Sequence, residues 1–199
     1  MYKKLSEEEL HAIALNFREA IMAAKRAGRF TWHDRMHNFP GGCCDDSCDL
    51  LAYHLRKEYG IESVQRNGVY RDDNEYNTTN HVWLLVYGEI IIDLTVTQFP
   101  FGFDMPNGLY FGKENVHYRQ MKAKSQRNYD IINSERLLND YHIIMEYMTW
   151  IQRGQAVYSD YLGPNAISPE EYDSYEPMYL LTLVLLFCLL LPVPSLSFL

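Results

Sequence analysis

The first segment of the chain has the apolar spacing of an amphipathic helix. Its buried stripe should consist of Leu10, Ile13, Ala14, Phe17 and Ile21. These positions recur three and four residues apart, which matches the helical period. Ser6 and Glu9 both precede the stripe and are three residues apart. This is the pattern of a capping box, which marks the start of a helix. Gly28 is the residue expected to end the run.

A second helix is predicted after the next stretch of mixed residues. It should begin near Cys44, directly after a Gly-Gly turn. Leu51, His54 and Leu55 would then share one face of the helix. Gly60 stands where a left-handed C-cap residue belongs, so the helix should end there.

The middle of the chain has the character of β-strands. Residues 62–70 form one candidate strand, and residues 71–80 are a polar stretch without a packing signal, which predicts a loop. Residues 81–87 and 90–96 are rich in β-branched and aromatic side chains and are separated only by Gly88-Glu89. That spacing predicts a hairpin with a two-residue turn.

A further helix follows a Gly/Pro-rich segment. Ser134 should cap it, and the helix should end near Gly154. The residues expected to be buried on it are Leu137, Leu138, Tyr141, Met145 and Met148. Helices, then strands, then a helix predict an α+β domain over residues 1–176, with helices packed on a small antiparallel sheet.

The C-terminal tail, residues 177–199, differs from this domain. No charged residue occurs in residues 178–199, but two prolines interrupt the segment and its apolar run is short for a bilayer. The tail therefore either anchors the chain to a membrane, packs on the domain as a helix, or stands outside the fold.

The overall charge limits the partners. With 18 basic and 26 acidic residues the net charge is −8, which gives no electrostatic basis for binding nucleic acid. The first residues turn acidic and helical, without the apolar core of a signal peptide. We therefore expect a cytoplasmic protein in a reducing compartment, associated with a membrane only through its tail, in which disulfides do not form.

Three of the four cysteines lie in one short stretch, at positions 43, 44 and 48. A zinc site is one interpretation, since Cys44 and Cys48 are four residues apart, as are His33 and His37, but adjacent cysteines fit zinc spacing only loosely. The other interpretation is that one of these cysteines is a nucleophile, because the thiolate form is favoured at a helix start and beside an imidazolium. We favour Cys44 as a nucleophile and expect no metal.

A histidine and a carboxylate are available on the predicted hairpin. His81 begins the first strand, and Asp93 lies inside the second, where an apolar strand requires a partner for it. A two-residue turn pairs Tyr87 with Ile90, and His81 then lies opposite Val96 and not opposite Asp93. A bulge or a twist would have to bring His81 and Asp93 together.

The stretches "FPGGCCDDSCDLLAYHL" and "NHVWLLVYGEIIIDLTVTQF" resemble the transglutaminase-like branch of the papain-fold cysteine enzymes. The resemblance covers residues 39–99. Its first motif falls on Gly42, Cys44 and Asp46, its second on His81 and Trp83, and its third on Asp93 and Thr95. Cys48 and Asp45 depart from the pattern, which has Ser and Gly there, and Asp45 adds negative charge beside the thiol.

The resemblance implies a papain-like fold and an acyl-transfer enzyme with a Cys44-His81-Asp93 triad and no cofactor. Trp83 would form a wall of the site or part of the core. Asn38 would either donate to the oxyanion beside the Cys44 N–H or only form a turn. The substrate would be a protein, a peptide or a small amide, with hydrolysis favoured over transglutaminase or N-acyltransferase chemistry. A papain-fold binding module without activity and a zinc-binding module remain the alternatives.

Overall fold

The computed structural model describes residues 4–71 and 78–152. Helix α1 spans Glu7–Arg26 and begins with the predicted capping box, in which Ser6 and Glu9 each accept a hydrogen bond from the other's backbone N–H. Ala27 is its C-cap, and Gly28 follows with a φ of 69°. Both ends of this helix are therefore close to where the sequence predicts them.

Helix α2 spans Cys44–Tyr59, and its bounds confirm the sequence prediction. Gly60 is the left-handed C-cap, with a φ of 65°, and its N–H donates to the carbonyl of Arg56. The predicted apolar face, which includes His54, is buried. Two of the three clustered cysteines, Cys44 and Cys48, lie in this helix, and the third, Cys43, is its N-cap residue.

The strands form one antiparallel sheet in the order β4-β3-β2-β1-β5. Its strands are β1 (Ser63–Arg71), β2 (Thr78–Val86), β3 (Ile90–Asp93), β4 (Tyr110–Gly112) and β5 (Lys124–Gln126). Strand β2 begins at Thr78, so the predicted loop over 71–80 is wrong at both ends: Arg71 still belongs to β1 and Thr78 already pairs with it.

The β2–β3 hairpin does not have the predicted two-residue turn. Val86 pairs with Ile90, and Tyr87 is a turn residue with a φ of 54°. A positive φ is unfavourable for tyrosine, and contacts with the N-terminal segment hold it there: Leu5 N–H donates to the Tyr87 hydroxyl at 3.3 Å. The pairing is therefore one residue away from the prediction.

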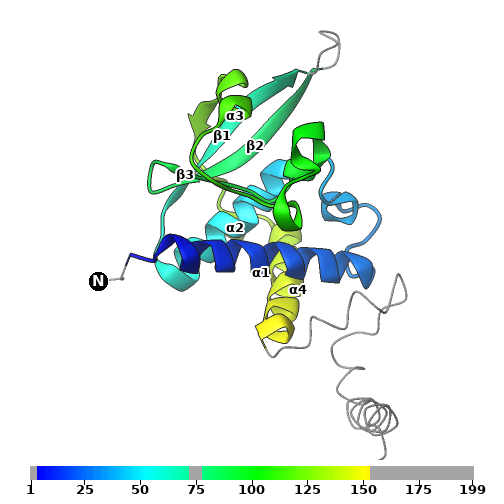
Figure 1. Ribbon diagram of the computed structural model, residues 1–199. Coiled ribbons are helices and arrows are strands. Elements are labelled where there is room, and N and C mark those ends of the chain that lie inside the picture. Colours follow the sequence, from blue (N-terminus) through cyan, green and yellow to red (C-terminus); the bar gives the residue numbers. More distant parts are fainter. Residues whose placement is uncertain (1–3, 72–77, 153–199) are drawn as a thin grey trace, which may run out of the picture.

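Two layers of packing follow from this register. Alternate residues of the hairpin, including Val82, Leu84 and Ile92, belong to the main core with α1, α2 and the C-terminal helix α4 (Glu135–Gln152). Trp83 and Ile91 belong to a smaller core on the other side with the short helix α3 (Val116–Gln120). Figure 1 shows α1 and α4 crossing each other below the sheet, with α3 beside the strands.

Helix α4 buries more of its surface than its sequence predicts. Leu137, Tyr141 and Met148 are buried as expected, but Leu138 and Met145 are only half-buried, which corrects that prediction. The additional buried apolar residues are Ile143, Ile144, Tyr147 and Trp150, and Asp140 is buried as well. The helix is described as far as Gln152, so its predicted end near Gly154 lies outside the described residues.

The architecture is α+β, with helices packed on a small antiparallel sheet of five strands. The predicted domain end at 176 and the apolar tail 177–199 both lie outside the described residues. Within residues 4–71 and 78–152, none of the helices has the length and apolar character needed to cross a membrane.

Candidate functional site

The hairpin brings His81 and Asp93 into direct contact. Their Nε2 and Oδ2 atoms lie 2.6 Å apart, and both side chains are almost completely buried. With Leu84 opposite Ile92, the next pair along the hairpin places Asp93 across from Trp83, which shares a face with His81. His81 and Asp93 are thus diagonal neighbours on one face of the sheet, and the observed register brings them together without the bulge or twist that the predicted register would have required.

Asp93 receives three further hydrogen bonds. The backbone N–H and the hydroxyl of Thr95 both donate to Oδ1, at 2.9 Å and 3.1 Å. The hydroxyl of Tyr118, on α3, donates to Oδ2 at 2.9 Å. Burial by itself would raise the pKa of Asp93, but the positive charge of His81 and these donors together hold that pKa below its ordinary value.

The pKa of His81 is raised to about 9. Burial of the ring favours the neutral form, but the charge and hydrogen bond of Asp93, together with the nearby thiol of Cys44, outweigh that effect. Phe99 packs edge-on against the imidazole, with ring centroids 4.6 Å apart, and helps to exclude water. The imidazolium is therefore the stable form of His81 at neutral pH.

Cys44 is the first residue of α2, at the positive end of the helix dipole. Its side chain is partly exposed and lies close enough to His81 to help raise the pKa of that ring. Nε2 of His81 is engaged by Asp93, and the other ring nitrogen, Nδ1, lies 3.0 Å from Nε2 of Gln98. Cys44 and Asp93 thus both interact with the His81 ring.

The two neighbouring cysteines have a different environment. Cys43 and Cys48 are both buried. Burial raises the pKa of Cys43 to about 12 and raises that of Cys48 well above its ordinary value, where the charge of Asp93 adds to the effect. Both thiols are therefore held in their protonated, unreactive form.

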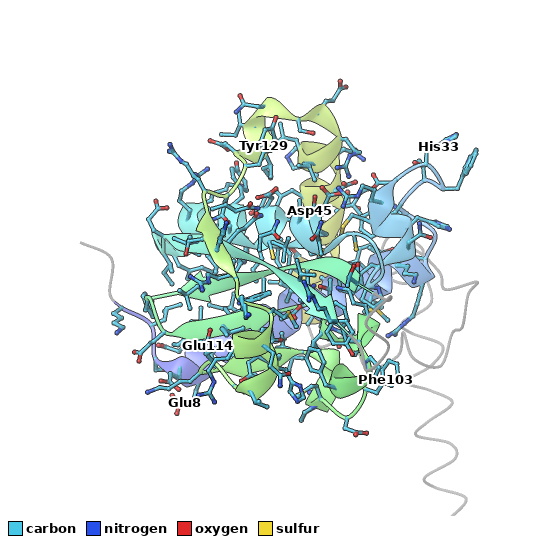
Figure 2. All side chains as sticks on the ribbon, turned by 90° about the horizontal axis from the view of Figure 1, so that it is seen from above. Glu8, His33, Asp45, Phe103, Glu114 and Tyr129 are labelled. Atoms are coloured by element: carbon cyan, nitrogen blue, oxygen red, sulfur yellow. The ribbon has the colours of Figure 1, made fainter. Side chains whose placement is uncertain are left out.

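Two arginines compensate the acidic first turn of α2. Arg35 forms a bidentate ion pair with Asp45 and donates to the carbonyl of Gly42, at 2.8 Å from Nη2. Arg136, from α4, contacts Asp46 at 2.9 Å. Figure 2 shows Asp45 near the centre of the molecule viewed from above. The negative charge that the sequence places beside the thiol is therefore paired. Arg35 also holds the glycine turn before Cys44, through its hydrogen bond to the Gly42 carbonyl.

Helix α1 supports the segment that follows Asp93. The buried side chain of Arg18 donates from Nε to the carbonyl of Leu94 at 3.1 Å. A Cβ at Gly108 would come within 2.3 Å of Nη2 of this arginine, so a larger residue at this position would force the guanidinium to shift. Arg18 is a charged residue on an otherwise apolar helix face, which is the signal that could have identified it from the sequence.

Trp83 and Asn38 occupy different environments. Trp83 is buried, with its ring 4.9 Å from that of Tyr118 and 5.6 Å from that of His81. It forms a wall beneath the imidazole as part of the smaller core. Asn38 is exposed, and its carbonyl accepts from the N–H of Gly41 in the turn before α2. The structure thus brings Trp83 to His81 and places Asn38 in a turn.

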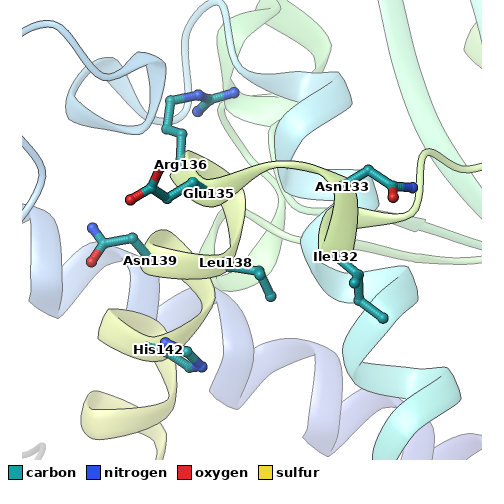
Figure 3. A pocket seen from close by; sticks show the side chains of 7 residues that line it. All are labelled: Ile132, Asn133, Glu135, Arg136, Leu138, Asn139 and His142. Carbon is teal, nitrogen blue, oxygen red and sulfur yellow. The ribbon is translucent and has the colours of Figure 1, made fainter.

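An open pocket of about 800 Å³ lies along the start of α4. Figure 3 shows the guanidinium of Arg136 directed away from Leu138 and His142, which also line this pocket. None of Cys44, His81 and Asp93 lines it. Its connection to the site is indirect, through the ion pair between Arg136 and the first turn of α2.

The histidines considered as zinc ligands do not join the cysteines. His33 is exposed and stacks on Trp32, and it projects from the edge of the molecule (Figure 2). His37 is also exposed, and its Nδ1 lies 3.3 Å from the carbonyl of Phe30. In the part of the chain that the structure describes, no three His, Cys, Asp or Glu side chains are grouped as a metal site would require.

Sequence reasoning missed Tyr118, Gln98 and the two arginines that pair the acidic turn. Gln98 lies with its Nε2 3.0 Å from Nδ1 of His81. No sequence motif links any of these residues to Cys44 or His81. Their places at the site are therefore set by the fold and could not be predicted from the sequence.

Comparison with known proteins gives no match: no family model fits the chain, and neither a curated protein nor a solved structure is significantly similar to it.

Proposed function

We propose that this protein is a cysteine-dependent acyl-transfer enzyme that hydrolyses an amide or peptide bond. The observation that carries the proposal is the buried 2.6 Å contact between His81 and Asp93, with Cys44 at a helix start near the same ring. A nucleophile, a base and a group that orients the base are the three parts that such catalysis requires.

In the proposed reaction the thiolate of Cys44 attacks the carbonyl carbon of the substrate. The leaving amine takes the proton from Nδ1 of His81, and a thioester to Cys44 remains. Neutral His81 then removes a proton from water, which attacks the thioester and releases the acid. Asp93 keeps the ring oriented and stabilises its charged form throughout both steps.

The papain-like assignment is part of this proposal. Its support is the order of the parts: Cys44 begins a helix, His81 lies on a following strand and Asp93 on the next strand. Water is proposed as the acceptor because the reaction needs no second substrate site. Proteins, peptides and small amides are the proposed substrates, and no cofactor takes part.

Hydrolysis of fluorogenic peptide amides by the purified full chain tests the proposal. We expect Cys44→Ala to abolish turnover and Cys43→Ser to keep most of it, since Cys43 is a buried thiol of raised pKa. Mass spectrometry should find the acyl group on Cys44 of the unaltered protein. Turnover that survives in Cys44→Ala would contradict the proposal.

A papain-fold module that binds without catalysis is the competing function. It predicts that ligand binding survives Cys44→Ala and that no acyl adduct forms in the unaltered protein. The same two samples thus separate the two functions.

A further inference from the structure

The side chain of Gln98 approaches Nδ1 of His81, the ring nitrogen that Asp93 does not engage. Its Nε2 lies 3.0 Å from Nδ1 of His81 and 3.3 Å from Oγ1 of Thr95. The 3₁₀ turn Val96–Gln98 places it there, because the N–H of Gln98 donates to the carbonyl of Thr95 at 3.1 Å.

The hydrogen bonds of Thr95 fix which end of the amide faces the site. The Thr95 hydroxyl has one proton, which it gives to Oδ1 of Asp93. Towards Gln98 the hydroxyl can therefore only accept, so the NH₂ group, and not the carbonyl oxygen, lies next to it. One N–H points to Thr95, and the second N–H of the same group is directed at the space around Nδ1.

The second N–H loses its acceptor when His81 carries a proton on Nδ1. Nε2 already donates to Asp93, so a protonated ring is a donor on both sides. Two donors cannot bond to each other, so this Gln98 N–H is left without an acceptor next to Nδ1, on a ring with which Cys44 also interacts. A carbonyl attacked by Cys44 at this ring would develop a negative oxygen that a free N–H donor beside the ring could bind.

We propose that Gln98 is a catalytic residue whose side-chain N–H, together with the backbone N–H of Cys44, binds the oxyanion formed during acyl transfer. In this step the S–C bond forms while the carbonyl π pair moves to the oxygen. The pair returns as the leaving group departs with the C–X bond electrons. This inference rests on the proposed function and assigns the oxyanion contact to Gln98 in place of Asn38.

Two reagents separate an oxyanion role from a positioning role. p-Nitrophenyl acetate acylates a thiolate through an oxyanion, and its leaving group departs without needing a proton. Iodoacetamide alkylates the same thiolate by displacing iodide, and no oxyanion forms. Both rates are measured on the full chain carrying Gln98→Ala or Gln98→Met, with Gln120→Ala on the exposed end of α3 as the matched control.

We expect both Gln98 variants to acylate about 10²- to 10³-fold more slowly, which is the typical effect of losing one oxyanion donor. Their alkylation rate should change by less than about twofold, because the thiolate–imidazolium pair remains. Gln120→Ala should alter neither rate. Circular dichroism melts of each variant show that the fold is kept.

Equal slowing of acylation and alkylation would overturn the inference, since Gln98 would then only position His81. Unchanged acylation in both Gln98 variants would overturn it as well. If the unaltered protein gains no acetyl group at Cys44, or Cys44→Ala is acylated as fast, the proposed function itself fails and the oxyanion role fails with it.

Discussion

His81 and Asp93 meet at 2.6 Å across a hairpin whose turn is one residue longer than its sequence suggests. The extra turn residue is Tyr87, which the N-terminal segment holds at a positive φ. A shift of one residue exchanges the two faces of a strand. The contact between the two side chains therefore depends on this turn as much as on the residues themselves.

The hydroxyl of Tyr118 should be measurable in the stability of the fold. Tyr118→Phe removes one of the donors to the buried carboxylate of Asp93. A hydrogen bond to a charged group contributes about 2 kcal/mol, so the free energy of unfolding should fall by about that amount. Urea denaturation at neutral pH measures it.

Tyr129→Phe is the matched control for this change, since its hydroxyl donates to the carbonyl of Asn133 at the surface. It should alter the unfolding free energy by only a few tenths of a kcal/mol, because an exposed group exchanges the bond for water. Equal losses of unfolding free energy in the two variants would show that the Tyr118–Asp93 hydrogen bond stabilises the fold no more than an exposed one does.

The pairing of Arg35 with the acidic turn should influence the reactivity of Cys44. Its guanidinium interacts favourably with the charges of Asp45, Asp46 and Cys44. In Arg35→Ala the two carboxylates are less compensated and the Gly42 carbonyl loses its donor, so alkylation of Cys44 should slow several-fold. The rate of iodoacetamide labelling at low ionic strength measures this effect.

Asp45→Asn in the Arg35→Ala background separates charge from geometry. If charge dominates, the double variant should recover most of the lost rate, because one uncompensated carboxylate is gone. If the double variant stays slow, the support of the glycine turn by Arg35 is the larger effect.

The stability of the protein should depend on pH through His81. Its folded-state pKa, about 9, lies above the ordinary value of 6.5. The folded state thus binds this proton more tightly, and the stabilisation is complete below about pH 6.5 and is lost as the pH rises through about 9. Denaturation curves across this range should show a decline.

His81→Gln isolates this contribution, since buried carboxyls such as Asp49, whose pKa burial raises to about 7, also change with pH. The difference in unfolding free energy between the two proteins should shrink as the pH rises from 6.5 to 9. A difference that stays constant over this range would mean that His81 is not charged in the folded protein.

The helices of this fold could be predicted closely because their signals are local. The capping box at Ser6, the start of α2 at Cys44 and the left-handed Gly60 all lie where the residues themselves set the backbone. The turn at Tyr87 could not be predicted, because its conformation depends on a contact with Leu5 far along the chain. Local propensity is overridden where a distant contact compensates the cost.

In the candidate site, too, some residues could be predicted from the sequence and others could not. Cys44, His81 and Asp93 could be named from their order, but Tyr118 and Arg136 could not, since a Tyr on a short helix and an Arg on a distant one carry no local signal. Their role arises only when the sheet and α4 are in place. The buried carboxylate of Asp93 did predict that a partner must exist.

Selective alkylation tests the central claim, that Cys44, His81 and Asp93 act as one nucleophilic unit. At about pH 6.5 a limiting dose of iodoacetamide should label Cys44 before Cys43 and Cys48, because Cys44 is partly exposed and lies near His81, whereas the other two thiols are buried with raised pKa values. His81→Ala should slow this labelling about tenfold or more, because the thiolate loses its imidazolium partner. Peptide mass spectrometry of the labelled protein identifies the thiol. First labelling at Cys43, or labelling of Cys44 that His81→Ala leaves unchanged, would contradict the claim.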